Sequence, residues 1–328
     1  MKAVQVFARS SMSTARPKIA ISACLLGERV RFNAGHKESR LCSREFARYF
    51  DFVPLCPEMA IGLGTPRQPI RLVGDPTSPR AVGTRDATLD VGTPLAAYGE
   101  RMAGELDDID GFIFMQKSPS CGLERVKVHQ ADSHSAEGTG RGLFAAAFCA
   151  RRPELPVEEE GRLHDPVLCE NFVTRVFVHA EWRQSLGQNL SRRTLLDFHA
   201  RHKYLLMASH PQQYRALGRL LGDLGRHAPE EFGPCYFARL MAALRRCASR
   251  GGHGNVLQHL CGYLRPALEP GERAELQRLI EQYRLGMLPL VVPLTLLKHH
   301  FRRHPHPYVA RQVYLQPHPE ELGLRNAI

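Results

Sequence analysis

The feature that most constrains the fold is a change of hydrophobic period near residue 160. Before it, short apolar runs alternate with helical stretches, whereas after it the apolar positions recur with helical spacing almost to the end. At 328 residues the chain is long for one compact core. We therefore expect an α/β N-terminal domain with a mostly parallel sheet, followed by an all-α C-terminal domain.

The expected sheet rests on three strand-like runs, at 18–24, 51–56 and 111–117. Helical patterns at 43–50 and 94–109 lie between them, an alternation typical of mostly parallel strands. The Gly/Pro-rich stretch 62–92 indicates loops around a short hairpin. In the second half, helices are expected to begin after Asp165, Ser191 and His210, because Pro or a capping side chain stands there.

Four segments follow from these patterns. Residues 1–17 read as an N-terminal extension, with Met12 as an alternative start, and 18–150 as the α/β domain. Residues 151–162, RRPELPVEEEGR, have two prolines, an acidic run and no periodicity, which predicts a linker. Residues 163–328 form the helical domain.

Charge is distributed unevenly between the halves. Residues 1–162 carry 22 Lys and Arg against 20 Asp and Glu, whereas 163–328 carry 22 against 13, a net charge of +9. This asymmetry suggests that the helical domain meets a polyanion. The chain has no apolar run long enough for a membrane helix, so we expect no membrane partner and a cytoplasmic location.

Three of the nine cysteines share a position. Cys24, Cys56 and Cys121 each follow a predicted strand, and ligands collect outside the carboxyl ends of parallel strands. Three convergent thiolates can hold a metal, either closed by a fourth ligand or open to substrate. Burial as small hydrophobic side chains is the alternative, and it suits the other six cysteines better.

Two neighbours add acid–base chemistry. Glu58 follows Cys56 by two residues and can serve as a general acid or base, or else as a carboxylate favoured at a helix start. Ser118 and Ser120 flank Pro119 and can orient water or substrate.

At this point the residues match known families. ISACLLGERVRF, LCPEMAIGLGTPRQPI and KSPSCG resemble the signature blocks of the thiouracil desulfidase domain, over about residues 18–150. FHARHKYLLMASHPQQYRALGRL and MLPLVVPLTLLKHHF resemble the YbgA-family domain, over about 163–320. The combination is similar to RNA desulfidases that remove sulfur from 4-thiouridine in tRNA. Ala60 departs from the pattern, where a Gly is common.

The resemblance implies a [4Fe-4S] cluster held by Cys24, Cys56 and Cys121, with one iron open, and it implies catalytic roles for Glu58 and Ser118. Residue spacing alone leaves zinc and iron–sulfur open. The implied reaction is hydrolytic and needs no external electrons, with thiolated tRNA as the partner. Free thiouracil or a thionucleoside is the alternative substrate, and an RNA-binding adaptor with a structural metal is the alternative of another class.

The helical domain would then contact RNA phosphates, in a salt-dependent way. The candidate contacts are Arg192, Arg193, Arg201, Lys203, Arg215, Arg219, Arg245, Arg246, Arg250, Arg302 and Arg303. The pairs His199/His202 and His299/His300 can be imagined as a second metal site, but hydrogen-bonded histidines or RNA contacts are favoured.

Overall fold

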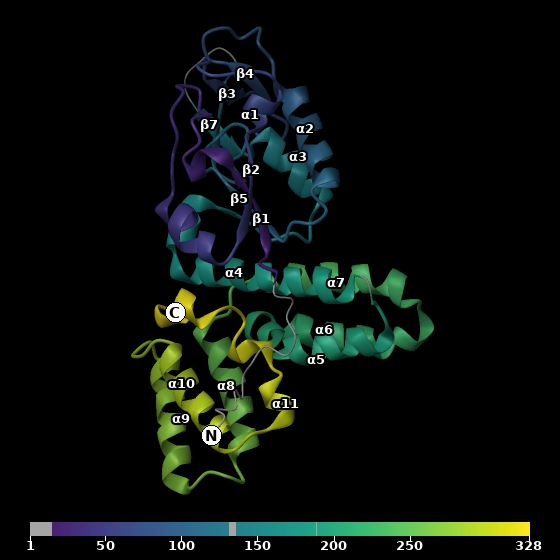
Figure 1. Ribbon diagram of the computed structural model, residues 1–328, viewed down its shortest axis with the longest axis vertical. Coiled ribbons are helices and arrows are strands. Elements are labelled where there is room, and N and C mark those ends of the chain that lie inside the picture. Colours follow the sequence, from purple (N-terminus) through teal and green to yellow (C-terminus); the bar gives the residue numbers. More distant parts are fainter. Residues whose placement is uncertain (1–14, 131–135, 188) are drawn as a thin grey trace. The chain divides into compact units, whose positions relative to one another are not determined.

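A computed structural model describes residues 15–130, 136–187 and 189–328. The expected extension at residues 1–17, with its alternative start at Met12, lies outside the described residues apart from 15–17. The described chain divides into an α/β unit, residues 15–164, and a helical unit, residues 165–328 (Figure 1). This order of fold classes is the one that the two hydrophobic periods predict.

The α/β unit is built on a four-stranded sheet in the order β2-β1-β5-β8, and all its pairings are parallel. This confirms the mostly parallel sheet. Strand β1 pairs with β2 on one edge and with β5 on the other, since its Ile19 is opposite Phe52 on one side and Gly111 on the other. The strands are β1 (Lys18–Ser22), β2 (Asp51–Leu55), β5 (Gly111–Phe114) and β8 (Val157–Glu159).

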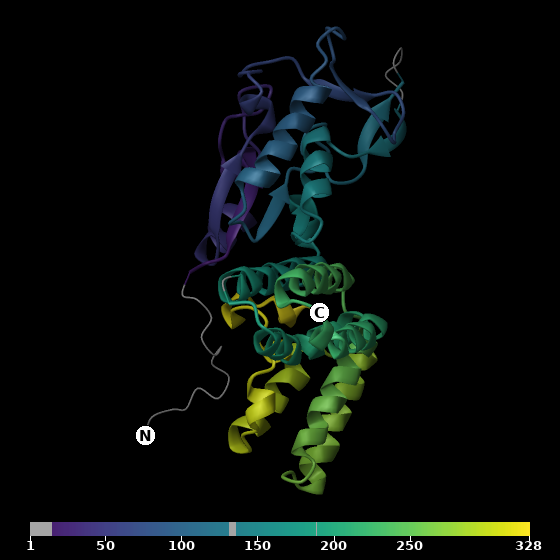
Figure 2. The ribbon, with the colours of Figure 1, turned by 90° about the vertical axis from the view of Figure 1, so that its right-hand side faces the viewer.

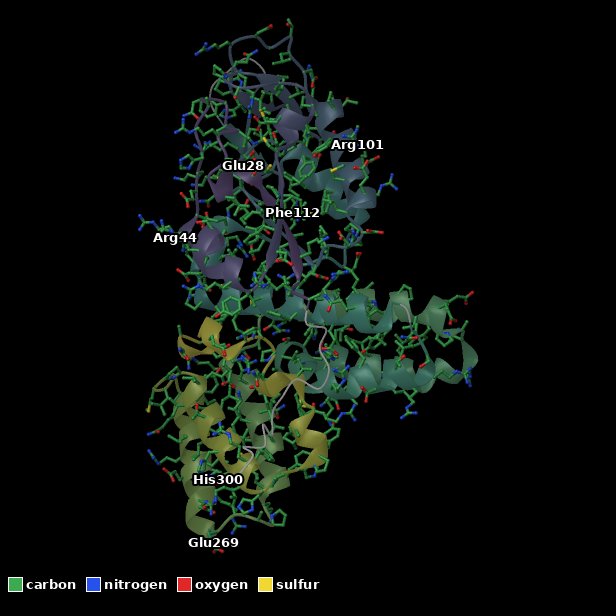
Figure 3. The ribbon with its side chains drawn as sticks, viewed as in Figure 1. Glu28, Arg44, Arg101, Phe112, Glu269 and His300 are labelled. Carbon is green, nitrogen blue, oxygen red and sulfur yellow. The ribbon has the colours of Figure 1, made fainter. Side chains whose placement is uncertain are left out.

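Two long helices, α2 (Gly92–Glu105) and α3 (Leu143–Arg151), lie side by side in this unit (Figures 1 and 2). Gly99 permits their close approach, because a Cβ at that position would lie 2.6 Å from the carbonyl oxygen of Phe144. Phe112 of β5 is fully buried (Figure 3), and its ring centroid is 5.2 Å from that of Phe148. An aromatic cluster therefore joins the sheet to α3.

A second sheet, in the order β4-β3-β6-β7, goes beyond what the periodicity predicts. Its β3–β4 pair is antiparallel and is the hairpin expected within 62–92, whereas β3 and β6 pair in parallel. The predicted helix at 43–50 is instead two short helical turns, Leu41–Glu45 and Phe46–Arg48. The remaining elements of this unit are β3 (Ile70–Val73), β4 (Arg80–Gly83), β6 (Val126–His129), β7 (Ala136–Gly140) and the short helix α1 (Pro57–Ala60).

The segment 151–162 differs from the expected linker. Its residues 157–159 are strand β8, paired with β5, and a 3-10 turn follows at Glu160–His164. Glu159 is buried, and its Oε1 accepts hydrogen bonds from the backbone N–H groups of Leu123 (2.8 Å) and Glu124 (3.2 Å). The acidic run is misleading in sequence because Glu158 and Glu159 accept hydrogen bonds from backbone N–H groups, which offsets the usual penalty for burying a carboxylate.

The helical unit begins as its capping residues predict. Asp165 accepts hydrogen bonds from the N–H groups of Val167 and Leu168, and Ser191 forms a capping box with Thr194. The unit packs around one apolar core. Its helices are α4 (Pro166–Glu181), α5 (Arg192–Ser209), α6 (Pro211–Gly222), α7 (Pro229–Leu244), α8 (Arg250–Leu264), α9 (Pro270–Arg284), α10 (Val291–Arg303) and α11 (Pro307–Ala310). Among the helices of the described residues, none has both the length and the apolar character needed to cross a membrane.

The carboxylate of Glu159 offers a direct test of the reassigned segment. We expect Glu159→Ala to lower the free energy of unfolding by about 1–3 kcal/mol, because two backbone donors would be left without their acceptor. Urea unfolding followed by circular dichroism measures the change. The exposed Glu100→Ala is the matched control and should remain near wild type. Equal effects of the two substitutions would contradict the capping role of Glu159.

Candidate active site

Three cysteines stand at the carboxyl ends of three neighbouring strands. Cys24 follows β1, Cys56 follows β2 directly, and Cys121 lies on the turns after β5. Because the sheet order places β1 between β2 and β5, parallel pairing brings these three strand ends to one edge. All three cysteines line one cavity of about 460 Å³.

The thiols share a low-dielectric setting. Burial raises the pKa of Cys24 to about 11, and the neighbouring Cys56 and Glu58 add to the rise while Arg31 opposes it. Burial also raises the pKa of Cys121 well above its usual value, although a hydrogen bond with Ser22 works against the rise. Three thiolates here therefore need a positively charged group among them, as metal coordination provides.

The donor set fits an iron–sulfur group. Such clusters are held by cysteine thiolates, and a cluster of several irons is larger than one ion, so its ligands surround a cavity. Among the described residues, no group of three His, Cys, Asp or Glu side chains is placed to hold a metal ion. Cys24, Cys56 and Cys121 would be the ligands of a cluster, a role that stays a prediction from the resemblance.

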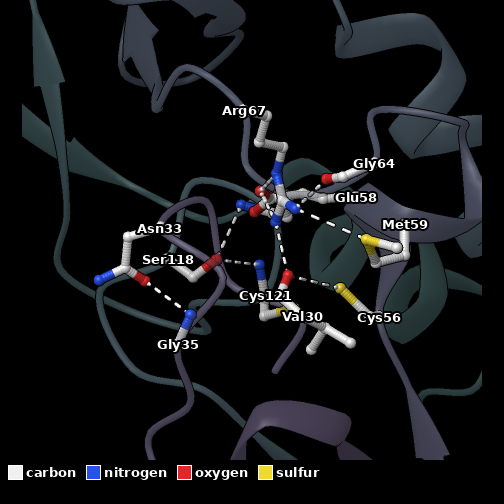
Figure 4. A network of polar contacts seen from close by, with 11 residues as sticks. Val30, Asn33, Gly35, Cys56, Glu58, Met59, Gly64, Arg67, Ser118 and Cys121 are labelled. Carbon is white, nitrogen blue, oxygen red and sulfur yellow. Dashed lines mark hydrogen bonds and ion pairs between the residues drawn. The ribbon is translucent and has the colours of Figure 1, made fainter. Parts of the chain in front are cut away.

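Glu58 is the one carboxylate among the lining residues of the cavity, and its two oxygens are both held by hydrogen bonds (Figure 4). Its Oε2 accepts hydrogen bonds from Nε (2.9 Å) and Nη2 (2.6 Å) of Arg67, and its Oε1 accepts one from the hydroxyl of Ser120 (2.8 Å). Both members of the Glu58–Arg67 pair are largely buried. Arg67 is itself fixed by the carbonyls of Val30 and Gly64. A fork-shaped guanidinium held this firmly sets the direction of the carboxylate.

Ser118 lines the cavity, but its oxygen also has a structural task. It accepts hydrogen bonds from the backbone N–H groups of Ser120 (3.2 Å) and Cys121 (3.1 Å), which closes the turn carrying the cysteine (Figure 4). A hydroxyl that accepts twice still has a hydrogen to donate. The catalytic role of Ser118 therefore stays a prediction beside this observed role.

The start of α3 holds the same turn from the other side. The N–H groups of Leu143 and Ala145 donate to the carbonyls of Pro119 (3.0 Å) and Ser120 (3.1 Å). Gly142 makes the contact possible, because a Cβ there would lie 2.5 Å from backbone atoms of Ser120. Cys121 is thus positioned by backbone contacts that do not depend on a bound group.

Sequence reasoning missed Arg67, and it expected Ser120 to orient water or substrate, whereas the hydroxyl of Ser120 donates to Glu58. Both touch Glu58, and neither lies within five residues of it in the sequence. Two of the sequence blocks that resemble the desulfidase domain could have pointed to these residues. LCPEMAIGLGTPRQPI contains Arg67, and KSPSCG contains Ser120. Only the fold shows that these two blocks share one carboxylate.

Three further cations line the cavity: Arg31, Lys37 and Lys117. Lys117 has a left-handed backbone (φ 58°), an uncommon conformation for a residue with a side chain. Arg67 is paired with Glu58, so the lining as a whole carries an excess of positive charge. Such a cavity favours an anionic substrate.

The candidate RNA contacts fall into two groups. Arg201 is paired with both Glu181 and Asp197, and the ammonium of Lys203 lies 4.8 Å from the ring centroids of Tyr204 and Tyr308. We therefore no longer expect Arg201 to reach a phosphate, because its guanidinium already binds two carboxylates. The exposed candidates are Arg192, Arg193, Arg215, Arg219, Arg245, Arg246, Arg250, Arg302 and Arg303, of which Arg303 is ion-paired with Glu272 (3.0 Å).

One of the two histidine pairs, His199 and His202, makes polar contacts within the helical unit, as the favoured alternative to a second metal site predicts. His199 Nδ1 lies 2.9 Å from the hydroxyl of Tyr236, and His202 Nδ1 lies 2.8 Å from the carbonyl of Phe198. Burial lowers the pKa of His199 to about 4, so this side chain is neutral near pH 7. These two histidines are hydrogen-bonded parts of the helical core.

Comparisons with known proteins follow the same division. Residues 19–160 match the family described as 2-thiouracil desulfurase, and residues 203–319 match a family of proteins of unknown function, DUF1722. The uncharacterized protein YbgA of Escherichia coli (strain K12) is 31% identical over 159 residues, which cover 48% of this chain and 94% of that protein. A solved structure described as the [4Fe-4S]-dependent thiouracil desulfidase TudS is 27% identical, covering 46% of this chain and 95% of that chain, with a TM-score of 0.35.

The chain joins two modules, an α/β unit with a three-thiol cavity and a helical unit. It belongs to the YbgA family, and it carries a 2-thiouracil desulfurase domain in front of the YbgA-like region.

The three cysteines are tested by anaerobic reconstitution with iron and sulfide. We expect Cys24→Ala, Cys56→Ala and Cys121→Ala each to lose visible cluster absorbance and most bound iron, because each removes one of three ligands. Cys235→Ala, at an exposed position of α7, is the control and should load like wild type. A Cys121→Ala protein with full iron and sulfide content would contradict the assignment.

Proposed function

We propose that the α/β unit is a desulfidase that replaces the sulfur of a thiolated uracil ring with oxygen, and that its substrate is 4-thiouridine in tRNA. The observation that carries the proposal is the cavity shared by Cys24, Cys56, Cys121 and Glu58. The match of residues 19–160 to the 2-thiouracil desulfurase family supports the reaction class.

The cofactor in this proposal is a [4Fe-4S] cluster with three cysteine ligands. When bound, it would supply a soft Lewis acid suited to a thiocarbonyl sulfur. The protein's own contribution is to hold the ring in the cavity, direct a water molecule, and move protons.

Glu58 is the proposed general base. It would act as a carboxylate, whose two oxygens are held by two hydrogen bonds from Arg67 and one from Ser120. In that form it takes a proton from water as the water oxygen adds at C4, and it then returns the proton to the departing sulfur. Ser118, with a hydroxyl hydrogen to donate, would orient the water or the base edge.

The net reaction balances without electron transfer. One C=S bond is replaced by C=O, water supplies the oxygen and both protons, and the sulfur leaves as hydrogen sulfide. The reaction is therefore hydrolytic in this proposal and calls for no reductant.

The positive lining favours a nucleotide within RNA over a free base. An uncharged thiouracil ring offers no anionic group to Arg31, Lys37 and Lys117, whereas the phosphates beside a thiolated nucleotide do. The exposed arginines of the helical unit, and the net charge of +9 on residues 163–328, extend this preference to a large polyanion. Free thiouracil remains the second candidate, since the matched family is described by that substrate.

The direct test uses the full chain after anaerobic reconstitution. Thiolated tRNA is incubated with the protein, and nucleoside analysis follows 4-thiouridine and uridine. We expect conversion of one to the other with release of sulfide. Binding of tRNA without conversion would favour the RNA-binding adaptor, and conversion of free thiouracil alone would favour the second candidate.

Glu58→Gln tests the base. We expect kcat on thiolated tRNA to fall by about 100- to 10,000-fold while the cluster absorbance persists, because the amide cannot accept a proton from water. Glu28→Gln, at an exposed position of the same unit, is the matched control. Unchanged turnover by the Glu58 variant would remove this carboxylate from the mechanism.

Lys37→Ala distinguishes thiolated tRNA from a free nucleoside as the substrate that the cavity recognises. If the exposed Lys37 side chain meets a phosphate, KM for tRNA should rise several-fold and its salt dependence should become shallower, while KM for the free 4-thiouridine nucleoside stays unchanged. The exposed Lys127→Ala is the control for charge alone. A parallel change on both substrates would place Lys37 in ring binding and would speak against phosphate recognition.

A further inference from the structure

A second cavity, of about 280 Å³, lies within the helical unit. One wall is a single face of α10, on which Val291, Leu294, Thr295, Lys298 and Arg302 recur at helical spacing. The other wall is the C-terminal segment from Leu315 to Asn326. The N–H of Leu290 donates to the carbonyl of Ile328 (2.7 Å), which ties the end of this segment to the start of α10.

Cationic side chains gather at this cavity. Lys298, Arg302 and Arg325 line it together with the imidazole of His318, and Glu320 is the only carboxylate among its lining residues. Burial lowers the pKa of Lys298, and the charges of Arg325 and Arg302 add to that effect although Glu320 opposes it. Lys298 is therefore close enough to Arg302 and Arg325 to be influenced by their charges, although Arg325 is itself paired with Glu170.

Two side chains of the cavity, Arg325 and His318, are buried with one nitrogen each left without a hydrogen-bond partner within the described chain. Arg325, 8% exposed, donates to Glu170 from Nε (3.0 Å) and to the carbonyl of Tyr314 from Nη1 (2.6 Å), but its Nη2 meets no acceptor within the described chain. His318, 4% exposed, has its Nδ1 3.2 Å from the carbonyl of Pro319, while its Nε2 lies 3.7 Å from Glu170, too far for a hydrogen bond. Buried nitrogens without a hydrogen-bond partner are uncommon in native proteins.

The carboxylate beside Lys298 is replaceable. Glu320 pairs with Lys298, but its side chain is 61% exposed, whereas that of Lys298 is 12% exposed. An ion pair with one partner largely in water contributes little to stability. An incoming anion can therefore take the place of Glu320 next to the buried ammonium.

The size and apolar wall of the cavity exclude a bare inorganic ion as the best occupant. The volume is several times the roughly 30 Å³ that one water occupies in the liquid, and it approaches the lower end of organic ligand sites. Val291, Leu294, Leu315 and Leu324 offer apolar surface beside the cations, and Gln316 and Asn326 offer amides. This combination suits a phosphate group joined to a planar, hydrogen-bonding ring.

We propose that this cavity binds a phosphate monoester of mononucleotide size, with the phosphate held by Lys298, Arg302 and Arg325 and the base against the apolar face of α10. The ligand is either a free nucleotide or the phosphorylated end of an RNA chain. The proposal concerns the helical unit and does not depend on desulfidase activity.

Isothermal titration of the full chain with UMP, AMP, uridine and inorganic phosphate tests the site. We expect a nucleoside monophosphate to bind more tightly than uridine or inorganic phosphate. Arg302→Ala, on the exposed rim, should weaken nucleotide binding about ten-fold or more, because one charge-assisted contact is lost. Arg278→Ala, an exposed arginine of α9 that is not part of the lining, should leave the affinity unchanged.

Glu320→Gln supplies the sharper test, because its expected effect on nucleotide affinity is opposite in sign to that of Arg302→Ala. Removing the competing carboxylate should strengthen nucleotide binding, an effect that general destabilisation would not produce. Inorganic phosphate binding as well as the nucleotide, or affinity that responds to Lys37→Ala and not to Arg302→Ala, would overturn the proposal. Competition between UMP and RNA oligonucleotides with and without a 5′-phosphate then identifies the source: competition by the phosphorylated oligonucleotide alone indicates an RNA end, and no competition indicates a free nucleotide.

Discussion

The site depends on the parallel pairing of β1 with β2 on one edge and β5 on the other. Parallel strands end at the same edge of a sheet, so residues that follow the three strands meet although nearly a hundred positions separate the first from the last. The cavity, its three thiols and Glu58 all follow from this pairing. A change in strand order would separate the cysteines without altering one of them.

Around that edge, polar groups are held before any ligand arrives. Arg67 and Ser120 fix the two oxygens of Glu58, and Ser118 together with the start of α3 fixes the turn that carries Cys121. Glu159 binds the backbone just beyond that turn. This organisation matters for chemistry because a base already directed at its target need not be reoriented during the reaction.

The two units divide the chemistry in the proposed function. The α/β unit provides thiols and a base, whereas the helical unit provides exposed arginines and a second, cationic cavity between α10 and the C-terminal segment. Several cations of the helical unit are already used internally: Arg201 binds Glu181 and Asp197, and Arg325 binds Glu170. Net charge alone therefore overstates the surface available for nucleic acid.

The sequence by itself determined the two fold classes, the three strand-end cysteines and the helix starts after Asp165, Ser191 and His210, because these depend on local periodicity, capping residues and strand termini. It misled at 151–162, since an acidic segment next to prolines looks solvated until backbone donors are found for its carboxylates. The second sheet beyond its hairpin, and the link of Arg67 and Ser120 to Glu58, also stayed hidden, because each joins residues distant in the chain. Tertiary structure alone decided which charged groups became paired and buried, since that outcome depends on partners that no local pattern specifies.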